Sequence, residues 1–388
     1  MIPTKNIYLD HAGTTPLSAS MKTYLTSLLD LYGNPSSIYS IGEESKQIIS
    51  KARQSVAQFI HVDPSDIYFT GGGSAGNTLA IKGLVSEHPQ LNRYEVFYSP
   101  TAHKSMLKAC ESCICHTPLK VNSVGELDLS YLDQLLAQHH DLMPLVCMEA
   151  ANSETGVINN VPETGAVVRQ HKGILVVDAT GYIPSYQIDM RLWMDYVDIL
   201  TFSGHKLHAL KGIGALWKRH DLKLKPLIYG SQEQSLVGGT ENILGIASLG
   251  KAVEDYDYSS ITSRNRDYVY DYIMKNIPDS YLAGPCIESG NRLPHNLYMC
   301  FKDVEGESLL LLLDINGIQV STGSACNSKS LSASPALSAM GISEDDIHSF
   351  IRFTFSGQET KEELNYVCKK LDECVNHLRN LNIETKTV

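Results

Sequence analysis

The sequence lacks the features that would take a protein to a membrane or to nucleic acid. No apolar run in its 388 residues approaches membrane-spanning length, and the first residues, MIPTKNIYLD, contain no apolar core of signal-peptide length. Basic residues are fewer than acidic ones: the chain has 32 Lys and Arg residues and 43 Asp and Glu residues, which gives a net charge of −11. We therefore expect a cytoplasmic protein that neither enters a membrane nor binds nucleic acid directly.

The chain also lacks a complete zinc motif. Cys110, Cys113, Cys115 and His116 lie close together in ACESCICH, but structural zinc sites usually draw on two ligand pairs, and no second CxxC or HxxxH follows. In a reducing compartment the nine cysteines should be free thiols. We expect no metal here, and a helix end that runs into a strand instead.

Short β-rich runs alternate with longer helical stretches over the first two thirds of the chain. The run ILVV is apolar without alternation, as expected for a strand buried on both faces of a parallel sheet. This order predicts an α/β fold with a large, mostly parallel sheet. Strands are expected at 66–70, 94–100, 144–150, 173–180 and 196–203, and helices at 78–88 and 103–112.

The pattern changes near residue 255. An amphipathic helix at 263–277 and a last helix over 360–380 predict a second, smaller α+β domain. Two domains also suit the length, because 388 residues exceed what one hydrophobic core usually supports.

A glycine-rich turn is the first of four segments that could carry chemistry. Three glycines in FTGGGSAGN (69–77) follow a strand and precede a helix, so backbone N–H groups and the helix N-terminus could approach an anion. The segment is not a Walker loop, since the Gly-Lys-Ser/Thr ending is missing, nor a dinucleotide fingerprint. A tight turn without a ligand is the alternative.

Three charged residues complete the set. Asp178 closes a buried strand, where a carboxylate needs a cation or a hydrogen-bond donor, or could cap a helix. Lys206 follows a strand and is either an imine-forming amine in a desolvated pocket or a plain surface lysine. Arg352 in FIRFTFS could bind a carboxylate or form a structural ion pair. The cradle, the Asp and the Lys together fit pyridoxal 5′-phosphate, through its phosphate, ring nitrogen and aldehyde.

One cysteine, Cys326, lies in STGSACNSKS among small and polar residues. A structural cysteine is usually buried among apolar neighbours. This setting indicates a solvent-reachable loop, in which the thiol is a candidate reagent.

Over nearly its whole length the chain resembles the class V aminotransferase superfamily and, within it, the group I cysteine desulfurases of the iron–sulfur and nitrogen-fixation type. The motifs that carry the resemblance are IYLDHAGTTP, GNPSSIYSIG, FSGHKLHALKGIGAL, GGTEN, GSAC and IRFT. The resemblance implies the type I fold of pyridoxal-phosphate enzymes. It also implies a large cofactor-binding domain over 16–255 and a small domain, 1–15 with 256–388, that carries the Cys326 loop.

The resemblance also implies roles for individual residues. Lys206 would bind the cofactor aldehyde, Asp178 would keep the ring nitrogen protonated, and His103 would stack on the ring and transfer protons. Cys326 would take sulfur from L-cysteine as a persulfide, leaving L-alanine, for delivery to a sulfur-acceptor protein. The phosphate and ring contacts would include Gly73, Ser74, Ser153, Ser203 and His205; Thr240 would reach the other subunit of a homodimer, and Arg352, with Asn34, would bind the substrate carboxylate.

Three positions depart from the pattern of these relatives. Ser153 and Gly181 replace an Asn and a Gln that contact the phenolic oxygen of the cofactor, and Val237 replaces an Arg near the entrance. A retuned hold on the cofactor is therefore expected. Selenocysteine lyase is one alternative activity, and a weakly active or scaffold homologue that depends on a partner is another. The motifs leave the destination of the sulfur open among iron–sulfur assembly, tRNA thiolation and DNA phosphorothioation.

Overall fold

The computed structural model describes residues 6–85, 89–139, 141–323 and 333–386. Within them, seven strands form one sheet in the order β2-β8-β7-β6-β5-β3-β4. Only β8 runs antiparallel to its neighbours, which confirms the predicted α/β fold with a mostly parallel sheet. The strands are β2 (Ile67–Thr70), β3 (Tyr94–Tyr98), β4 (His116–Pro118), β5 (Met143–Glu149), β6 (Ile174–Asp178), β7 (Ile199–Ser203) and β8 (Gly214–Lys218).

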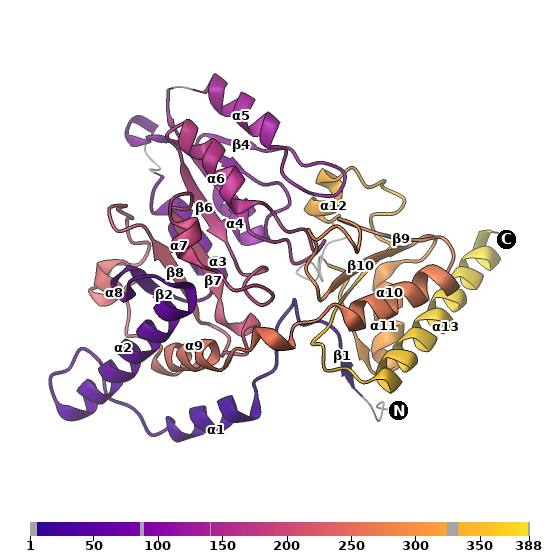
Figure 1. Ribbon diagram of the computed structural model, residues 1–388, viewed down its shortest axis with the longest axis horizontal. Coiled ribbons are helices and arrows are strands. Elements are labelled where there is room, and N and C mark those ends of the chain that lie inside the picture. The colour runs from indigo at the N-terminus through magenta and orange to yellow at the C-terminus, as the bar shows by residue number, and fades with distance from the viewer. Residues whose placement is uncertain (1–5, 86–88, 140, 324–332, 387–388) are drawn as a thin grey trace.

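Both faces of this sheet are covered (Figure 1). Alternate residues of β6 belong to different hydrophobic clusters: Leu175 and Val177 to one, Ile174 and Val176 to the other. Such double burial explains why the strand is apolar without alternation. The surrounding helices are α1 (Ala19–Ser27), α2 (Ser40–Ile60), α3 (Gly73–Lys82), α4 (Lys104–Glu111), α5 (Leu129–Gln138), α6 (Val161–Gln170), α7 (Met190–Trp193), α8 (Gln232–Ser235) and α9 (Ile243–Asp255).

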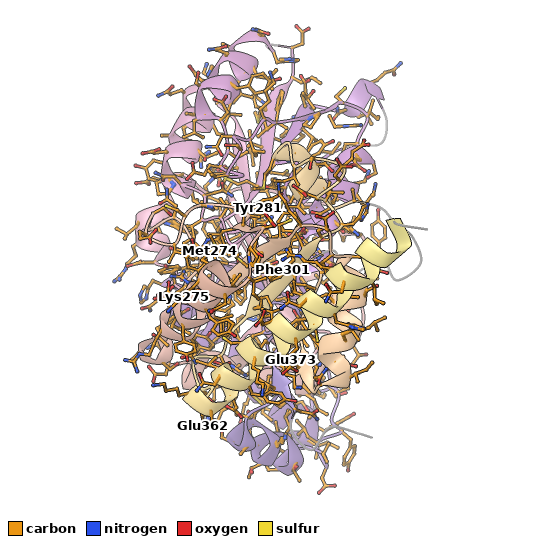
Figure 2. All side chains as sticks on the ribbon, turned by 90° about the vertical axis from the view of Figure 1, so that its right-hand side faces the viewer. Met274, Lys275, Tyr281, Phe301, Glu362 and Glu373 are labelled. Carbon is orange, nitrogen blue, oxygen red and sulfur yellow. The ribbon has the colours of Figure 1, made fainter. Side chains whose placement is uncertain are left out.

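A smaller sheet, in the order β12-β10-β9, is antiparallel. A separate hydrophobic cluster gathers Ile7 and Leu9 with residues from Val269 to Val375, so the two ends of the chain share one core. Figure 2 shows α13 and α10 lying over this sheet, with Tyr281 on β9 and Phe301 on β10 beneath them. The elements are β1 (Ile7–Tyr8), α10 (Arg264–Asn276), β9 (Ser280–Leu282), β10 (Asn296–Phe301), α11 (Gly306–Ile315), β11 (Ile318–Gln319), α12 (Pro335–Ala339), β12 (Phe350–Thr354) and α13 (Lys361–Lys386).

The cysteine-rich segment runs from the end of α4 at Glu111 to the start of β4 at His116, as predicted. Cys110 and Cys113 are buried there. Among the residues that the structure describes, no group of three His, Cys, Asp or Glu side chains is placed to hold a metal ion. The same residues include no helix with the length and apolar character needed to span a bilayer.

The strand directions decide where a site can form. Strands β2, β7, β6 and β5 all end at one edge of the large sheet, because β2 and β7 both run antiparallel to the β8 between them. Such edges are where α/β sheets usually place their ligands. Asp10 in the N-terminal segment and Arg352 on β12 lie near this edge.

Candidate active site

A cavity of about 250 Å³ lies at this edge of the sheet. Two walls enclose it. We call the first the sheet wall, built by residues at or after the ends of β2, β5, β6 and β7, and the second the clamp wall, built around Asp10 and Arg352. The predicted site residues that line the cavity are Gly73, Ser74, His103, Ser153, Asp178, Ser203, His205, Lys206 and Arg352.

Three predicted residues are not among those that line the cavity. Asn34 is exposed, and its side-chain oxygen accepts a hydrogen bond from the Ser36 backbone N–H at 2.9 Å. Thr240 is also exposed. Cys326 lies outside the described residues, but Gly323, the last described residue before it, lines the cavity.

Asp178, the last residue of β6, is held rigidly in the sheet wall. It is 5 % exposed, and its Oδ2 accepts a hydrogen bond from Asn77 Nδ2 at 2.7 Å, while Oδ1 accepts one from the Thr180 backbone N–H at 2.8 Å. Asn77, on α3, is itself fixed by Thr201 Oγ1, which donates to Asn77 Oδ1 at 2.5 Å. No helix begins after Asp178, so the helix-cap interpretation is wrong. The carboxylate faces the cavity, where it suits a protonated ring nitrogen.

Lys206 ends a short 3-10 turn, Gly204–Lys206, directly after β7. It lines the cavity, so it is not a plain surface lysine. Burial lowers the pKa of its amine to about 8, and the nearby charge of Arg352 adds to the effect, although Asp178 and Asp10 oppose it. A neutral amine is therefore accessible near physiological pH, as a lysine that attacks a carbonyl requires.

The glycine-rich turn forms a cradle for an anion. Gly72 has a φ of +120°, which L side chains rarely adopt, and Gly73 begins α3. A Cβ on Gly73 would lie 3.0 Å from Thr180 Oγ1, a buried hydroxyl with no hydrogen-bond partner among the described residues. The N-terminus of α3, the Ser203 hydroxyl and this free hydroxyl converge on one volume of the cavity. They suit a phosphate group.

His103 precedes α4 in the same cavity. Its Nδ1 accepts a hydrogen bond from the Ser105 backbone N–H at 3.2 Å, which places the proton of the neutral ring on Nε2. Ser105 Oγ in turn accepts from Asn77 Nδ2 at 3.0 Å, so one network joins His103 to Asp178. Burial lowers the pKa of His103, and nearby Lys206 and Lys104 lower it further, while Asp178 opposes them.

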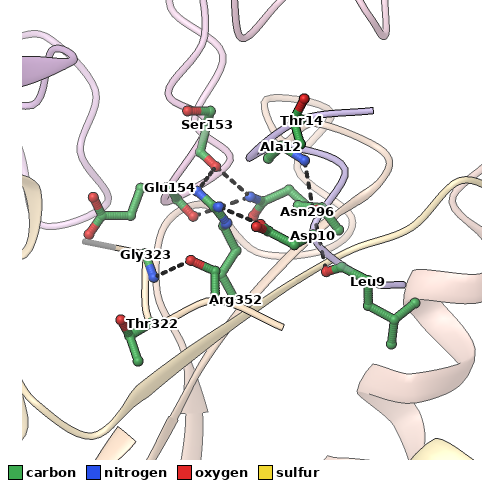
Figure 3. A network of polar contacts seen from close by, with 12 residues as sticks. Leu9, Asp10, Ala12, Thr14, Ser153, Glu154, Asn296, Thr322, Gly323 and Arg352 are labelled. Carbon is green, nitrogen blue, oxygen red and sulfur yellow. Dashed lines mark hydrogen bonds and ion pairs between the residues drawn. The ribbon is translucent and has the colours of Figure 1, made fainter. Parts of the chain in front are cut away.

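Arg352, on β12, dominates the clamp wall (Figure 3). Its Nη2 donates to Asp10 Oδ1 at 2.7 Å and its Nη1 to the Ser153 carbonyl at 3.0 Å. Arg352 is 5 % exposed, and its Nε is buried without a partner among the described residues. The structural ion pair that was the alternative therefore exists, but it leaves one donor of this planar group unsatisfied beside the cavity.

Sequence reasoning missed two residues of the sheet wall, Thr180 and Glu149. Glu149 ends β5, is 5 % exposed and lines the cavity. Burial raises the pKa of its carboxyl group to about 8. The signal was available, because an acid that closes a buried strand in LVCMEA obeys the rule that pointed to Asp178.

A second cavity, of about 370 Å³, adjoins the first. The two share Ala12, Ser153, Gly181 and Lys206 in their walls. A Cβ on Gly181 would lie 2.4 Å from the Ala151 carbonyl oxygen, so this backbone accepts no side chain at position 181 without moving. Two of the three departures from the desulfurase pattern thus lie where the cavities meet.

Comparisons with known proteins agree with this geometry. The model of the "Aminotransferase class-V" family matches residues 7–367. "Cysteine desulfurase IscS" of Dictyoglomus turgidum is 36% identical over 393 aligned residues, which cover 97% of this chain and 96% of that protein. "Cysteine desulfurase" of Nostoc sp. is 35% identical, with 97% of this chain and 94% of that protein covered.

Solved structures show the same likeness. A NifS-like protein from Rickettsia africae superposes with a TM-score of 0.85 at 27% identity, covering 96% of this chain and 99% of its own. A structure described as SspA in complex with cysteine gives a TM-score of 0.78 at 27% identity and covers 91% of this chain and 99% of its own. The chain therefore belongs to the class-V aminotransferase family.

Proposed function

We propose that the protein is a pyridoxal-phosphate-dependent cysteine desulfurase, which converts L-cysteine to L-alanine and passes the sulfur to Cys326. One observation carries the proposal: a cavity-facing lysine and a fixed aspartate lie opposite an arginine with an unsatisfied donor. Relatives named cysteine desulfurase match 97% of the chain, and an SspA structure with cysteine shares its fold.

The residues present fit the cofactor. Asp178 would face the ring nitrogen and Lys206 the aldehyde, while Gly73, Ser74, Ser203 and His205 would hold the phosphate. The buried hydroxyl of Thr180, which has no partner among the described residues, gives the phosphate a further donor. When bound, pyridoxal phosphate supplies an electron sink that stabilises negative charge on the α-carbon of the substrate.

The side chains of the protein then divide the work on L-cysteine. Arg352 would bind the substrate carboxylate, because its Nε is free and its fork matches two oxygens. Lys206 and His103 would move protons: the amine has a pKa of about 8, and the imidazole is aligned by Ser105. The substrate would lie between the clamp wall and the sheet wall.

Sulfur transfer is assigned to the Cys326 thiolate. It would form an S–S bond with the substrate sulfur while the carbon–sulfur bond of the substrate breaks. The β-carbon keeps the electron pair of that bond and takes up a proton, so L-alanine and a persulfide result. Gly323, the last described residue before Cys326, lines the cavity, and this supports the assignment.

The wider assignment follows the same proposal. The large domain would span 16–255, and the small domain 1–15 with 256–388; the separate cores around β6 and around β10 support this division. A cytoplasmic homodimer would let Thr240 of each subunit reach the cofactor phosphate of the other. The acceptor would be a sulfur-carrier or scaffold protein, in iron–sulfur cluster assembly or tRNA thiolation.

The test is mass spectrometry of the intact protein after incubation with cysteine, alongside measurement of released alanine. We expect added sulfur on Cys326 and one alanine per transferred sulfur. The Cys326→Ser variant is the control and should gain none. Cofactor-loaded protein that releases no alanine and gains no sulfur would overturn the assignment.

A further inference from the structure

Glu149 is a buried carboxyl group that the proposed function leaves without a role. It is the last residue of β5, and the parallel register pairs it with Asp178, the last residue of β6. Both residues are 5 % exposed and both line the main cavity. Two carboxyl groups thus stand on neighbouring strands at the edge of the sheet, where only one is needed to face a ring nitrogen.

The two oxygens of Glu149 have different surroundings. Oε1 accepts hydrogen bonds from Asn152 Nδ2 at 2.7 Å and from Thr101 Oγ1 at 3.2 Å. No described residue donates to Oε2, which is not among the fully buried unpartnered atoms either. Oε2 is therefore the oxygen that faces the cavity. A proton on this carboxyl group would sit on Oε2, because Oε1 already receives two donors.

The surroundings of Glu149 favour the protonated form of its carboxyl group. Burial is the main cause that raises its pKa to about 8, and the negative charges of Asp178 on β6 and Glu154 after β5 add to it. The hydrogen bonds from Asn152 and Thr101 act in the opposite direction. Lys206, after β7, is the cation that interacts with it across the cavity. At neutral pH the group therefore offers an O–H donor to the cavity.

The order of the strands indicates what this donor would meet. The phosphate cradle follows β2 and β7, Asp178 ends the next strand, β6, and Glu149 ends β5 beyond it. In pyridoxal phosphate the phosphate arm and the phenolic oxygen flank the aldehyde carbon on opposite sides of the ring. A ring with its phosphate toward β7 and its nitrogen at Asp178 presents the phenolic oxygen to the β5 side.

We propose that Glu149 is a cofactor-binding residue whose protonated Oε2 donates a hydrogen bond to the phenolic oxygen of the bound cofactor. This inference rests on the proposed function. Glu149 would give the cavity a neutral hydrogen-bond donor. Gly181, at the junction with the second cavity, has no side chain that could supply one. Stabilising the phenolate would make the neighbouring imine nitrogen release its proton at lower pH.

The experiment is a pH titration of the absorption spectrum of the cofactor-loaded protein without substrate, in wild type, Glu149→Gln and Glu149→Leu. Glu149→Leu removes the donor, so its spectral midpoint should rise by about one pH unit or more. Glu149→Gln keeps an N–H donor and should titrate within about half a unit of wild type below pH 8. Above pH 8, where Glu149 ionises, only the wild type should show a further shift.

A matched control is Glu95→Gln on β3, which removes a carboxylate of the same sheet that bonds to His139 outside the cavity. Its spectrum should titrate like the wild type. Circular dichroism checks that each variant is folded. If Glu149→Leu binds the cofactor and titrates like the wild type, the inference fails and the proposed function stands. If wild type shows no protein-bound cofactor band at all, the proposed function itself fails.

Discussion

The two walls of the cavity are built differently. In the sheet wall, Asp178 is fixed by donors from α3 and from its own turn, all within the large sheet and the helices that cover it. In the clamp wall, Arg352 contacts Asp10 and the Ser153 carbonyl, which belong to segments 342 and 199 residues away. In the first wall, both carboxylate oxygens of Asp178 have donors without any ligand. The second keeps an unsatisfied Nε and is bound to an aspartate that a substrate carboxylate could displace.

Two walls built in these ways allow one cavity to hold a permanent ligand and a transient one. A residue that is fully hydrogen bonded in a single core is preorganised and costs little to keep in place when the ligand binds. A residue that bridges separate segments changes partners more readily, because small relative movements alter its hydrogen bonds. We therefore expect changes in the sheet wall to alter cofactor binding, and changes in the clamp wall to alter substrate binding.

Replacing Lys206 should have the largest effect. Lys206→Ala removes the only group in the sheet wall proposed to react with the cofactor aldehyde, so alanine production should fall by about four orders of magnitude or more. The protein-bound absorption band should be lost, and borohydride should no longer attach the cofactor covalently. Full activity in this variant would contradict the division of labour between the walls.

Arg352 tests the clamp wall. Arg352→Ala should raise KM for cysteine by about 100-fold to 1000-fold, since a bidentate, charge-assisted contact is lost from a buried site. Arg352→Lys keeps the charge but not the fork, and should recover only part of this loss. The absorption of the bound cofactor should stay close to that of wild type in both variants. Steady-state kinetics and spectra on the same samples separate the two effects, and a lost cofactor with an unchanged KM would reverse our assignment.

The sheet wall could be predicted from local sequence because each of its residues follows a strand. Asp178 and Lys206 could be predicted as site residues because each lies at or just after the end of a buried apolar run. Glu149 obeyed the same rule and was still missed. The predicted helix at 78–88 was wrong at both ends: α3 starts at Gly73 and ends at Lys82.

The clamp wall was harder to predict, because its contacts depend on tertiary structure. Nothing near Arg352 in the sequence indicates that Asp10 is its partner; the contact forms because Leu9 packs with β12 residues in one core. The role of Asn77 was also invisible. The glycine-rich turn indicated backbone N–H groups for an anion, whereas its last residue uses a side chain to hold Asp178.

A third test measures the cost of preorganisation in cofactor-free protein. The pKa of Lys206 is about 8 in the fold against about 10.5 in an unfolded chain, so unfolding takes up protons between these values. The destabilisation of the folded state by the buried Lys206 amine is therefore complete below pH 8. It disappears as the pH rises to 10.5. Lys206→Met should therefore stabilise the cofactor-free protein at pH 7, by on the order of 2–3 kcal/mol.

Denaturant unfolding at pH 7 and pH 10 checks this sign. The advantage of Lys206→Met should shrink at the higher pH. The exposed Lys108→Met, whose ammonium pairs with Glu111 on the surface of α4, is the control and should show no comparable pH dependence. An advantage that grows with pH would mean that the amine is charged and stabilised in the fold.

Asn77 gives the finest test of the comparison, because it belongs to the sheet wall without lining the cavity. Asn77→Ala removes the donor that fixes Asp178 Oδ2 and leaves Thr201 Oγ1 without its acceptor. Asp178 should then hold the ring nitrogen less firmly, and the affinity for pyridoxal phosphate should fall about tenfold, the usual cost of one buried hydrogen bond. At saturating cofactor, KM for cysteine should stay within about twofold of wild type, opposite to the result for Arg352→Ala. Asn316→Ala, at the end of α11 and bonded to the Leu312 carbonyl, removes a partly buried amide that does not line the cavity and should change neither quantity. Equal losses in cofactor affinity and in KM would mean that the walls are coupled, since fixing the carboxylate on one side would then also set the arginine on the other.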